Sequence, residues 1–194
     1  LGDVYKRQDF DGVVVDTEPI YDIYWNEAGE RYQTGIPNFA SHIKGTTLPY
    51  ILDKYFSDRS EEFKEMVTRE SMDFEQKMPF PPVPGAMEFI HLLKSKDVKV
   101  GLVTSSDDAK LKRAFRLLKL DNLFDTVVSA DRITKGKPDP MCYQLAASDL
   151  HVSPADCLVF EDSFAGIQAG TNAGMRVIGL STTNSEESSK DKVY

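Results

Sequence analysis

The sequence predicts an α/β fold, an open and doubly wound parallel sheet interrupted by an inserted α-helical domain. Short Val-rich apolar runs bounded by Asp, Ser, Gly or Lys recur in the second half of the chain, and stretches with helical spacing separate them. Residues 17–82 lack such runs and carry helical periodicity instead. Alternating strands and helices are typical of a parallel sheet whose ligand site lies at the carboxyl ends of the strands.

The first element is expected to be a central strand leading into Asp9. Lys6, Arg7 and Gln8 nevertheless place charged and amide groups where a strand buried on both faces favours Val or Ile. This prefix is therefore either an unusually polar strand or sequence foreign to the fold.

The helical domain is expected to span residues 17–82. Four prolines within residues 79–84 mark its far end and return the chain to the sheet, because proline cannot continue a helix. The predicted core domain comprises residues 1–16 and 83–194, and we expect it to be incomplete at both ends.

The remaining elements of the core follow in alternation. Four apolar runs predict buried strands at residues 98–103, 126–129, 157–160 and 177–180. Helical spacing between them predicts helices at residues 86–94, 109–118, 141–149 and 165–173.

Composition narrows the class of protein. The chain has 194 residues, 41% of them hydrophobic, and a net charge of −8 with basic residues interleaved among acids. Nucleic acid is disfavoured as a partner, because phosphate backbones select clustered Lys and Arg. No apolar run is long enough to span a membrane and no secretory signal is recognisable, so we expect a cytoplasmic monomer. Cys142 and Cys157 are expected to be reduced packing thiols.

The sharpest motif is Asp9-Phe10-Asp11-Gly12. In an extended segment alternate residues point to the same side, so Asp9 and Asp11 present two carboxylates together. Gly12 allows the chain to turn sharply away. Two like charges this close favour a bound cation or a division of acid and base roles. The alternative is an ordinary acidic turn.

A second cluster, Thr104-Ser105-Ser106, follows a predicted strand and precedes a helix. Its hydroxyl and backbone N–H groups are suited to phosphate oxygens. The alternative is a plain helix N-cap at Ser106 or Asp107.

Two further clusters complete a set at the strand ends. Lys137 stands before Pro138 and can neutralise a developing negative charge, or it is a solvated surface lysine. Glu161 and Asp162 follow a buried strand and offer the oxygen ligands that Mg²⁺ prefers, or they cap the next helix. Together the four clusters form a constellation suited to phosphoryl transfer.

In this order and spacing, the four motifs resemble those of the haloacid dehalogenase (HAD) superfamily of phosphohydrolases, in the branch with a helical cap similar to β-phosphoglucomutase. The resemblance implies a Rossmann-like core with the cap inserted after the first motif, and a Mg²⁺-dependent phosphatase acting on a small phosphorylated metabolite. By the same resemblance Asp9 is the nucleophile that forms an aspartyl-phosphate, and Asp11 is the general acid and base.

The remaining roles also come from the resemblance. Mg²⁺ is expected to be held by Asp9, the Asp11 carbonyl and Asp162, with Glu161 assisting. The expected substrate-binding residues are Thr104, Ser105, Ser106, Lys137 and, from the cap, Lys44.

Two positions differ from the sugar-phosphate mutases of this branch and bear on the kind of reaction. Tyr21 stands where sugar-phosphate mutases of this branch have a histidine, and Leu48 stands where they have an arginine. Hydrolysis is therefore favoured over a mutase. A phospho-accepting signalling domain is a competing hypothesis from another class, and an inactive chain with incomplete ends is a third.

Overall fold

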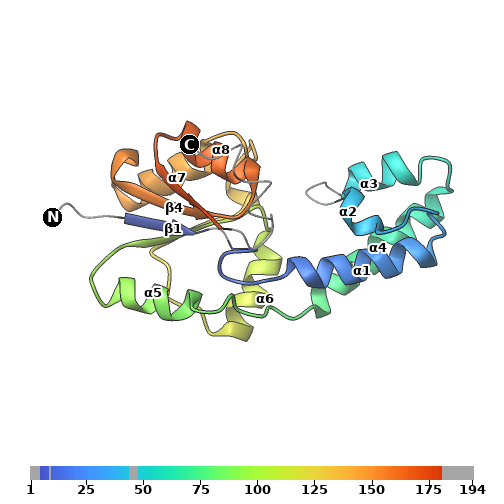
Figure 1. Ribbon diagram of the computed structural model, residues 1–194, viewed down its shortest axis with the longest axis horizontal. Coiled ribbons are helices and arrows are strands. Elements are labelled where there is room, and N and C mark those ends of the chain that lie inside the picture. Colours follow the sequence, from blue (N-terminus) through green and yellow to red (C-terminus); the bar gives the residue numbers. More distant parts are fainter. Residues whose placement is uncertain (1–4, 9, 44–47, 181–194) are drawn as a thin grey trace. The chain divides into compact units, whose positions relative to one another are not determined.

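A five-stranded parallel sheet forms the centre of the larger part of the chain. The computed structural model describes residues 5–8, 10–43 and 48–180, and the first of these ranges as backbone (Figure 1). The strand order is β3-β2-β1-β4-β5, and every neighbouring pair is parallel. The strands are β1 (Tyr5–Gln8), β2 (Val100–Val103), β3 (Thr126–Val128), β4 (Cys157–Glu161) and β5 (Arg176–Gly179).

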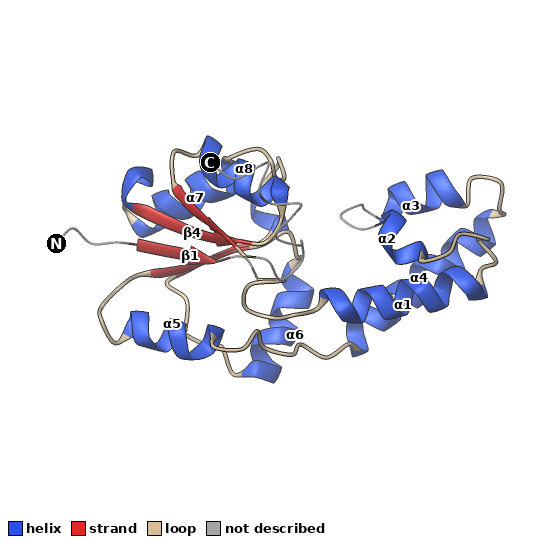
Figure 2. Ribbon diagram, viewed as in Figure 1, coloured by secondary structure: helices blue, strands red, loops and turns tan. Residues whose placement is uncertain are grey.

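Helices cover both faces of this sheet. One face carries α5 (Ala86–Lys94) and α6 (Asp108–Leu118), and the other carries α7 (Met141–Leu150) and α8 (Phe164–Asn172) (Figure 2). Short 3₁₀ turns lie at Ala130–Arg132 and Pro154–Asp156. The core below α7 and α8 includes Cys142 and Cys157, which confirms both as buried packing residues. The doubly wound α/β fold is thus confirmed.

The predicted elements agree with the observed ones to within a few residues at each end. The polar prefix pairs with β2 on one side and with β4 on the other, so it is the central strand despite its composition. The expectation that the core is incomplete at its C-terminal end concerns residues after 180, which lie outside the described part of the chain.

After the first motif the backbone turns at Gly12, which adopts φ +77°. This conformation favours glycine, as the sequence predicted. Gly12 N donates to the carbonyl of Val15 at 2.7 Å, and Val15 then forms a bridge with Pro82. The chain leaving the core and the chain returning to it are therefore hydrogen-bonded to each other.

The chain divides into two compact units, residues 1–16 with 80–194, and residues 17–79. The second boundary lies three residues before the expected one. The reason is local: Asp16 N donates to the Pro81 carbonyl at 2.8 Å, and Phe80 packs against Phe10 with ring centroids 6.1 Å apart. The first residues of the proline segment therefore belong to the core.

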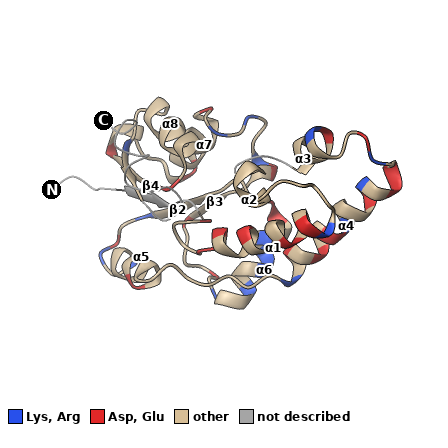
Figure 3. Cartoon of the chain, turned by 45° about the vertical axis from the view of Figure 1, so that its right-hand side comes forward, with Lys and Arg blue, Asp and Glu red and all other residues tan. Residues whose placement is uncertain are grey.

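The second unit is helical, as predicted. It consists of α1 (Glu18–Arg31), α2 (Phe39–Ile43), α3 (Leu48–Tyr55) and α4 (Glu61–Lys77). An aromatic cluster that includes Trp25, Tyr32 and Phe56 fills its interior. Burial raises the pKa of Tyr24 and of Tyr32, so both phenols stay neutral at physiological pH. Acidic and basic residues are interspersed along α4 (Figure 3).

Asp125 fixes the start of β2 in the core unit. Its carboxylate accepts from Lys94 Nζ at 2.7 and 2.8 Å and from Val100 N at 2.7 Å. Partial burial opposes the charged form, but the contacts with Lys94 and Val100 outweigh it and hold the pKa of Asp125 below its ordinary value of 3.8. A lowered folded-state pKa stabilises the protein above the unfolded value, and this stabilisation is lost as the pH falls through the folded value.

Replacing Asp125 with Asn is expected to lower the free energy of unfolding by about 1 kcal/mol at neutral pH, since Asn keeps the shape but loses the charge. The difference between the two proteins should shrink as the pH falls below about 4, because the wild-type carboxylate is then protonated. Urea unfolding followed by circular dichroism at several pH values measures this. A difference independent of pH would show that the ion pair contributes nothing.

Candidate active site

The sequence motifs meet at the carboxyl ends of β1, β2 and β4, all within the core unit. Because the strands are parallel, the residues that follow them emerge at the same edge of the sheet. Asp11 follows β1, Thr104 and Ser106 follow β2, and Asp162 follows β4. Two groups of contacts organise this edge, one around Asp11 and one around Glu161.

The Asp11 side chain is held by a hydroxyl and a cation. Ser106 Oγ donates to Asp11 Oδ2 at 2.8 Å. Lys110 Nζ, from the first turns of α6, donates to the two carboxylate oxygens at 2.9 and 3.0 Å. Both charged side chains keep some exposure, 24% for Asp11 and 12% for Lys110. The Asp11 carboxylate is thus oriented by protein donors and still reachable from solvent.

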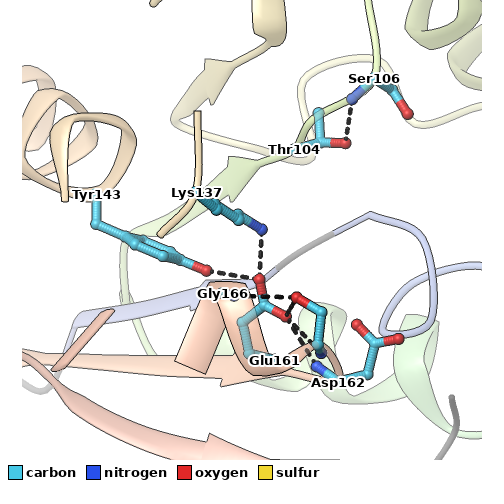
Figure 4. Close-up of polar contacts among 8 residues, drawn as sticks. Thr104, Ser106, Lys137, Tyr143, Glu161, Asp162 and Gly166 are labelled. Carbon is cyan, nitrogen blue, oxygen red and sulfur yellow. Dashed lines mark hydrogen bonds and ion pairs between the residues drawn. The ribbon is translucent and has the colours of Figure 1, made fainter. Parts of the chain in front are cut away.

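The turn after β2 is organised around Thr104, which is almost fully buried. Ser106 N donates to Thr104 Oγ1 at 3.0 Å (Figure 4), and Thr104 N donates to the Val128 carbonyl at 2.9 Å. Asp107 is the N-cap of α6 and accepts from Lys110 N at 2.8 Å, so the capping alternative is correct for Asp107. Ser106 bonds to Asp11 instead. Ser105 is exposed in the same turn.

Glu161 lies at the centre of the second group and is fully buried. Its Oε1 accepts from Lys137 Nζ and, at 3.0 Å, from the Tyr143 hydroxyl. Its Oε2 accepts from Asp162 N, Ser163 N and Ser163 Oγ at 2.9 to 3.0 Å. Figure 4 shows Lys137 and Tyr143 both pointing towards this carboxylate.

Glycine makes room for the buried carboxylate. A Cβ atom on Gly166, in the first turn of α8, would lie 1.6 Å from Glu161 Oε1, so a larger residue could not occupy this position without displacing the ion pair. Lys137 is itself only 6% exposed, which rules out the alternative that it is a solvated surface lysine. Charged groups are almost never buried this deeply unless they are paired.

Asp162 is the candidate metal ligand among the described residues. It is 6% exposed, and a Cβ atom on Gly12 would lie 1.9 Å from its Oδ2, so its carboxylate rests directly against the turn after β1. A carboxylate beside the backbone of the first motif is a donor set suited to a hard cation such as Mg²⁺. No group of three or more candidate metal ligands occurs within residues 10–43 and 48–180.

Two of the expected site residues, Asp9 and Lys44, lie outside the described part of the chain. Most of the others fall into two connected groups, Asp11 with Thr104 and Ser106, and Lys137 with Glu161 and Asp162. Ser105 lies exposed in the turn after β2, outside both groups. Sequence reasoning missed Lys110 and Tyr143. The signal for Lys110 was its place three residues after an N-capping aspartate, where a helical side chain can point back towards the strand ends.

The fold and the polar groups at the strand ends define a doubly wound α/β core with a carboxylate-rich site at one edge of its sheet, and comparison with known proteins identifies the family. Residues 8–180 match the family model described as haloacid dehalogenase-like hydrolase. The chain therefore belongs to the haloacid dehalogenase-like hydrolase family, as the motifs indicated. Within the described residues, no helix has both the length and the apolar content needed to cross a membrane.

Several relatives resemble this chain over most of its length. A phosphorylated carbohydrates phosphatase of Thermotoga maritima is 34% identical over 181 residues, covering 89% of this chain and 82% of the relative. The β-phosphoglucomutase of Bacillus subtilis is 32% identical over 186 residues, covering 89% and 80%. A crystal structure of a HAD hydrolase, family IA, variant 3, from Entamoeba histolytica has a TM-score of 0.80 at 24% identity, covering 95% of this chain and 86% of that one; it shares the fold.

Proposed function

We propose that this protein is a Mg²⁺-dependent phosphatase that hydrolyses a small phosphorylated carbohydrate through an aspartyl-phosphate on Asp9. The placement of the Asp11 carboxylate carries the proposal. A carboxyl group oriented by Ser106 and Lys110 and still partly exposed, two residues after the nucleophile position, lies where it can exchange a proton with an ester oxygen or with water. The family and the similarity to a phosphatase of phosphorylated carbohydrates support the same reaction.

In the proposed reaction the Asp9 carboxylate attacks phosphorus, the bond between phosphorus and the ester oxygen breaks, and Asp11 gives its proton to that oxygen. Asp11 then takes a proton from water, which attacks the aspartyl-phosphate and releases inorganic phosphate. Lys137, with the hydroxyl of Thr104, offsets the charge on the phosphoryl oxygens. Mg²⁺ would be held by Asp9, the Asp11 carbonyl and Asp162, and would supply positive charge to the phosphoryl group.

A mutase is the second candidate, because a β-phosphoglucomutase is among the similar proteins. The two departures noted in the sequence are packing positions of the helical unit. The ring of Tyr21 lies edge-on against that of Phe74, with ring centroids 5.5 Å apart, and its hydroxyl donates to Glu75 Oε1 at 3.0 Å. Leu48 packs against the aromatic core. Neither position has a positively charged side chain of the kind that a mutase needs to hold a bisphosphate. These contacts favour hydrolysis.

The test is phosphate release from a panel of sugar phosphates and from an activated aryl phosphate, with and without Mg²⁺. Asp11→Asn is expected to slow hydrolysis of the sugar phosphates by about 10²-fold or more, because their alkoxide leaving groups need a proton. The first step with the aryl phosphate, measured as the burst of aryl alcohol release, should be slowed much less, because this leaving group departs without a proton. Conversion of a sugar phosphate to its isomer without phosphate release would indicate the mutase instead.

The matched control is Asp97→Asn. Asp97 is exposed at φ +56°, a conformation that Asn tolerates well, so this substitution changes one carboxylate without perturbing the fold. It should leave every rate unchanged. Equal losses in both variants, or an aryl burst slowed as much as the hydrolysis of the sugar phosphates, would contradict the role of Asp11 as the acid.

A further inference from the structure

Tyr143 is fully buried on α7 and contacts both charged groups of the inner cluster. Its hydroxyl donates to Glu161 Oε1 at 3.0 Å, and its ring centroid lies 5.5 Å from Lys137 Nζ. A single aromatic side chain thus touches the anion through its hydroxyl and the cation through its ring, within range of a cation–π contact.

The hydrogen bonds of Glu161 leave its carboxylate little further capacity. An ionised carboxylate has about four lone-pair positions. The Oε1 atom accepts from Lys137 and Tyr143, and the Oε2 atom accepts from three donors at the start of α8. All five donors belong to the protein, and the carboxylate is fully buried. The side chain of Glu161 is therefore held in place by protein contacts.

We propose that Tyr143 is a positioning residue of the active site. Together with Glu161 it holds Lys137 Nζ in place at the site where the proposed function puts the phosphoryl group. The inference rests on the proposed function, in which Lys137 is the cation that holds phosphoryl oxygens. Tyr143 acts through Lys137 and makes no contact with substrate.

The hydroxyl matters for both geometry and charge. By donating to Oε1 it shares the negative charge that would otherwise fall wholly on Lys137, and it keeps the carboxylate from rotating towards the lysine. Without the hydroxyl, Glu161 is expected to hold Lys137 more tightly and to draw its charge away from a bound phosphate. The ring remains in place in a Phe variant, so packing is preserved.

The test compares Tyr143→Phe with wild type by calorimetric titration of inorganic phosphate in the presence of Mg²⁺, and by steady-state kinetics. Phosphate affinity and kcat/KM are expected to fall about tenfold. This is the size of effect typical of residues that orient a ligand-binding side chain without contacting the ligand themselves. The same substitution in a Glu161→Gln background should cause no additional loss, because the hydroxyl acts through the carboxylate.

The matched control is Tyr32→Phe in the helical unit. Its hydroxyl also donates to a carboxylate, Glu70 Oε2, at 2.7 Å. This variant should change the melting temperature without changing phosphate affinity. If Tyr143→Phe also changed only the melting temperature, its role would be structural and the proposal would be overturned.

A separate titration addresses Glu161. Glu161→Gln is expected to lose phosphate affinity, because the carboxylate that positions Lys137 is then neutral. This variant tests the same positioning role if Tyr143→Phe fails to fold. Unchanged phosphate affinity in Glu161→Gln would contradict the inference.

The proposed function can fail independently of this inference. A wild-type protein that binds phosphate but turns over no phosphate ester would refute the phosphatase, while the binding comparison still decides the role of Tyr143. A wild-type protein that binds no phosphate would overturn both proposals.

Discussion

Asp9→Asn is expected to abolish phosphate release from every substrate, with a loss of more than about a thousandfold. Asn has nearly the shape of Asp, but its neutral amide is a poor nucleophile, so the covalent step cannot begin. The melting temperature should change little by comparison. Phosphate release measured with freshly purified protein, together with acid trapping of the phosphorylated protein, tests both parts of this expectation.

The outcome separates three hypotheses. Turnover retained in Asp9→Asn would refute the nucleophile. A wild-type adduct that forms and persists without turnover would support a phospho-accepting signalling domain instead, because a switch has no need of rapid hydrolysis. An Asp97→Asn variant that loses activity as well would show that the loss is unspecific.

Lys137→Met is expected to lower the free energy of unfolding by about 3 kcal/mol or more, the largest loss among the variants described. Lys137 is 6% exposed and pairs with a fully buried Glu161, so removing the ammonium leaves a carboxylate in the core with only neutral donors. Urea unfolding measures the loss. Activity should fall together with stability, since the same cation is proposed to bind the phosphoryl group.

Two variants test the cause of this loss. Lys135→Met removes a lysine two positions earlier that is 68% exposed and lies 3.7 Å from Asp139, and it should cost less than about 1 kcal/mol. Adding Glu161→Gln to Lys137→Met should recover part of the stability, because the unpaired charge is then gone. A double variant less stable than Lys137→Met alone would contradict the buried-charge explanation.

Much of the fold could be predicted from local pattern. The strands of the core after the first are short apolar runs between polar boundaries, and a run such as residues 157–160 is typical of a strand buried between layers. The first strand shows where this reasoning fails. Its sequence contains Lys6, Arg7 and Gln8, yet its backbone pairs with β2 on one side and with β4 on the other. Tertiary context overrides local propensity there.

The candidate site was predicted in part. The positions of Asp11, Thr104, Lys137 and Asp162 followed from the rule that residues after parallel strands gather at one edge. The partners of these residues did not. Lys110 and Tyr143 lie on helices, and packing against the sheet decides which groups their side chains meet. The N-capping Asp107 was a signal for Lys110, and nothing in the sequence indicated Tyr143.

The amino-acid sequence alone determined the order of the elements and which charged groups stand at the strand ends, because both depend on neighbours along the chain. Only the tertiary structure decided how those groups are paired. Glu161 and Asp162 are adjacent and chemically alike, yet one is enclosed by five donors and the other lies against Gly12. Successive residues of an extended segment point in opposite directions, so each carboxylate meets different neighbours, and those neighbours come from segments distant in the sequence.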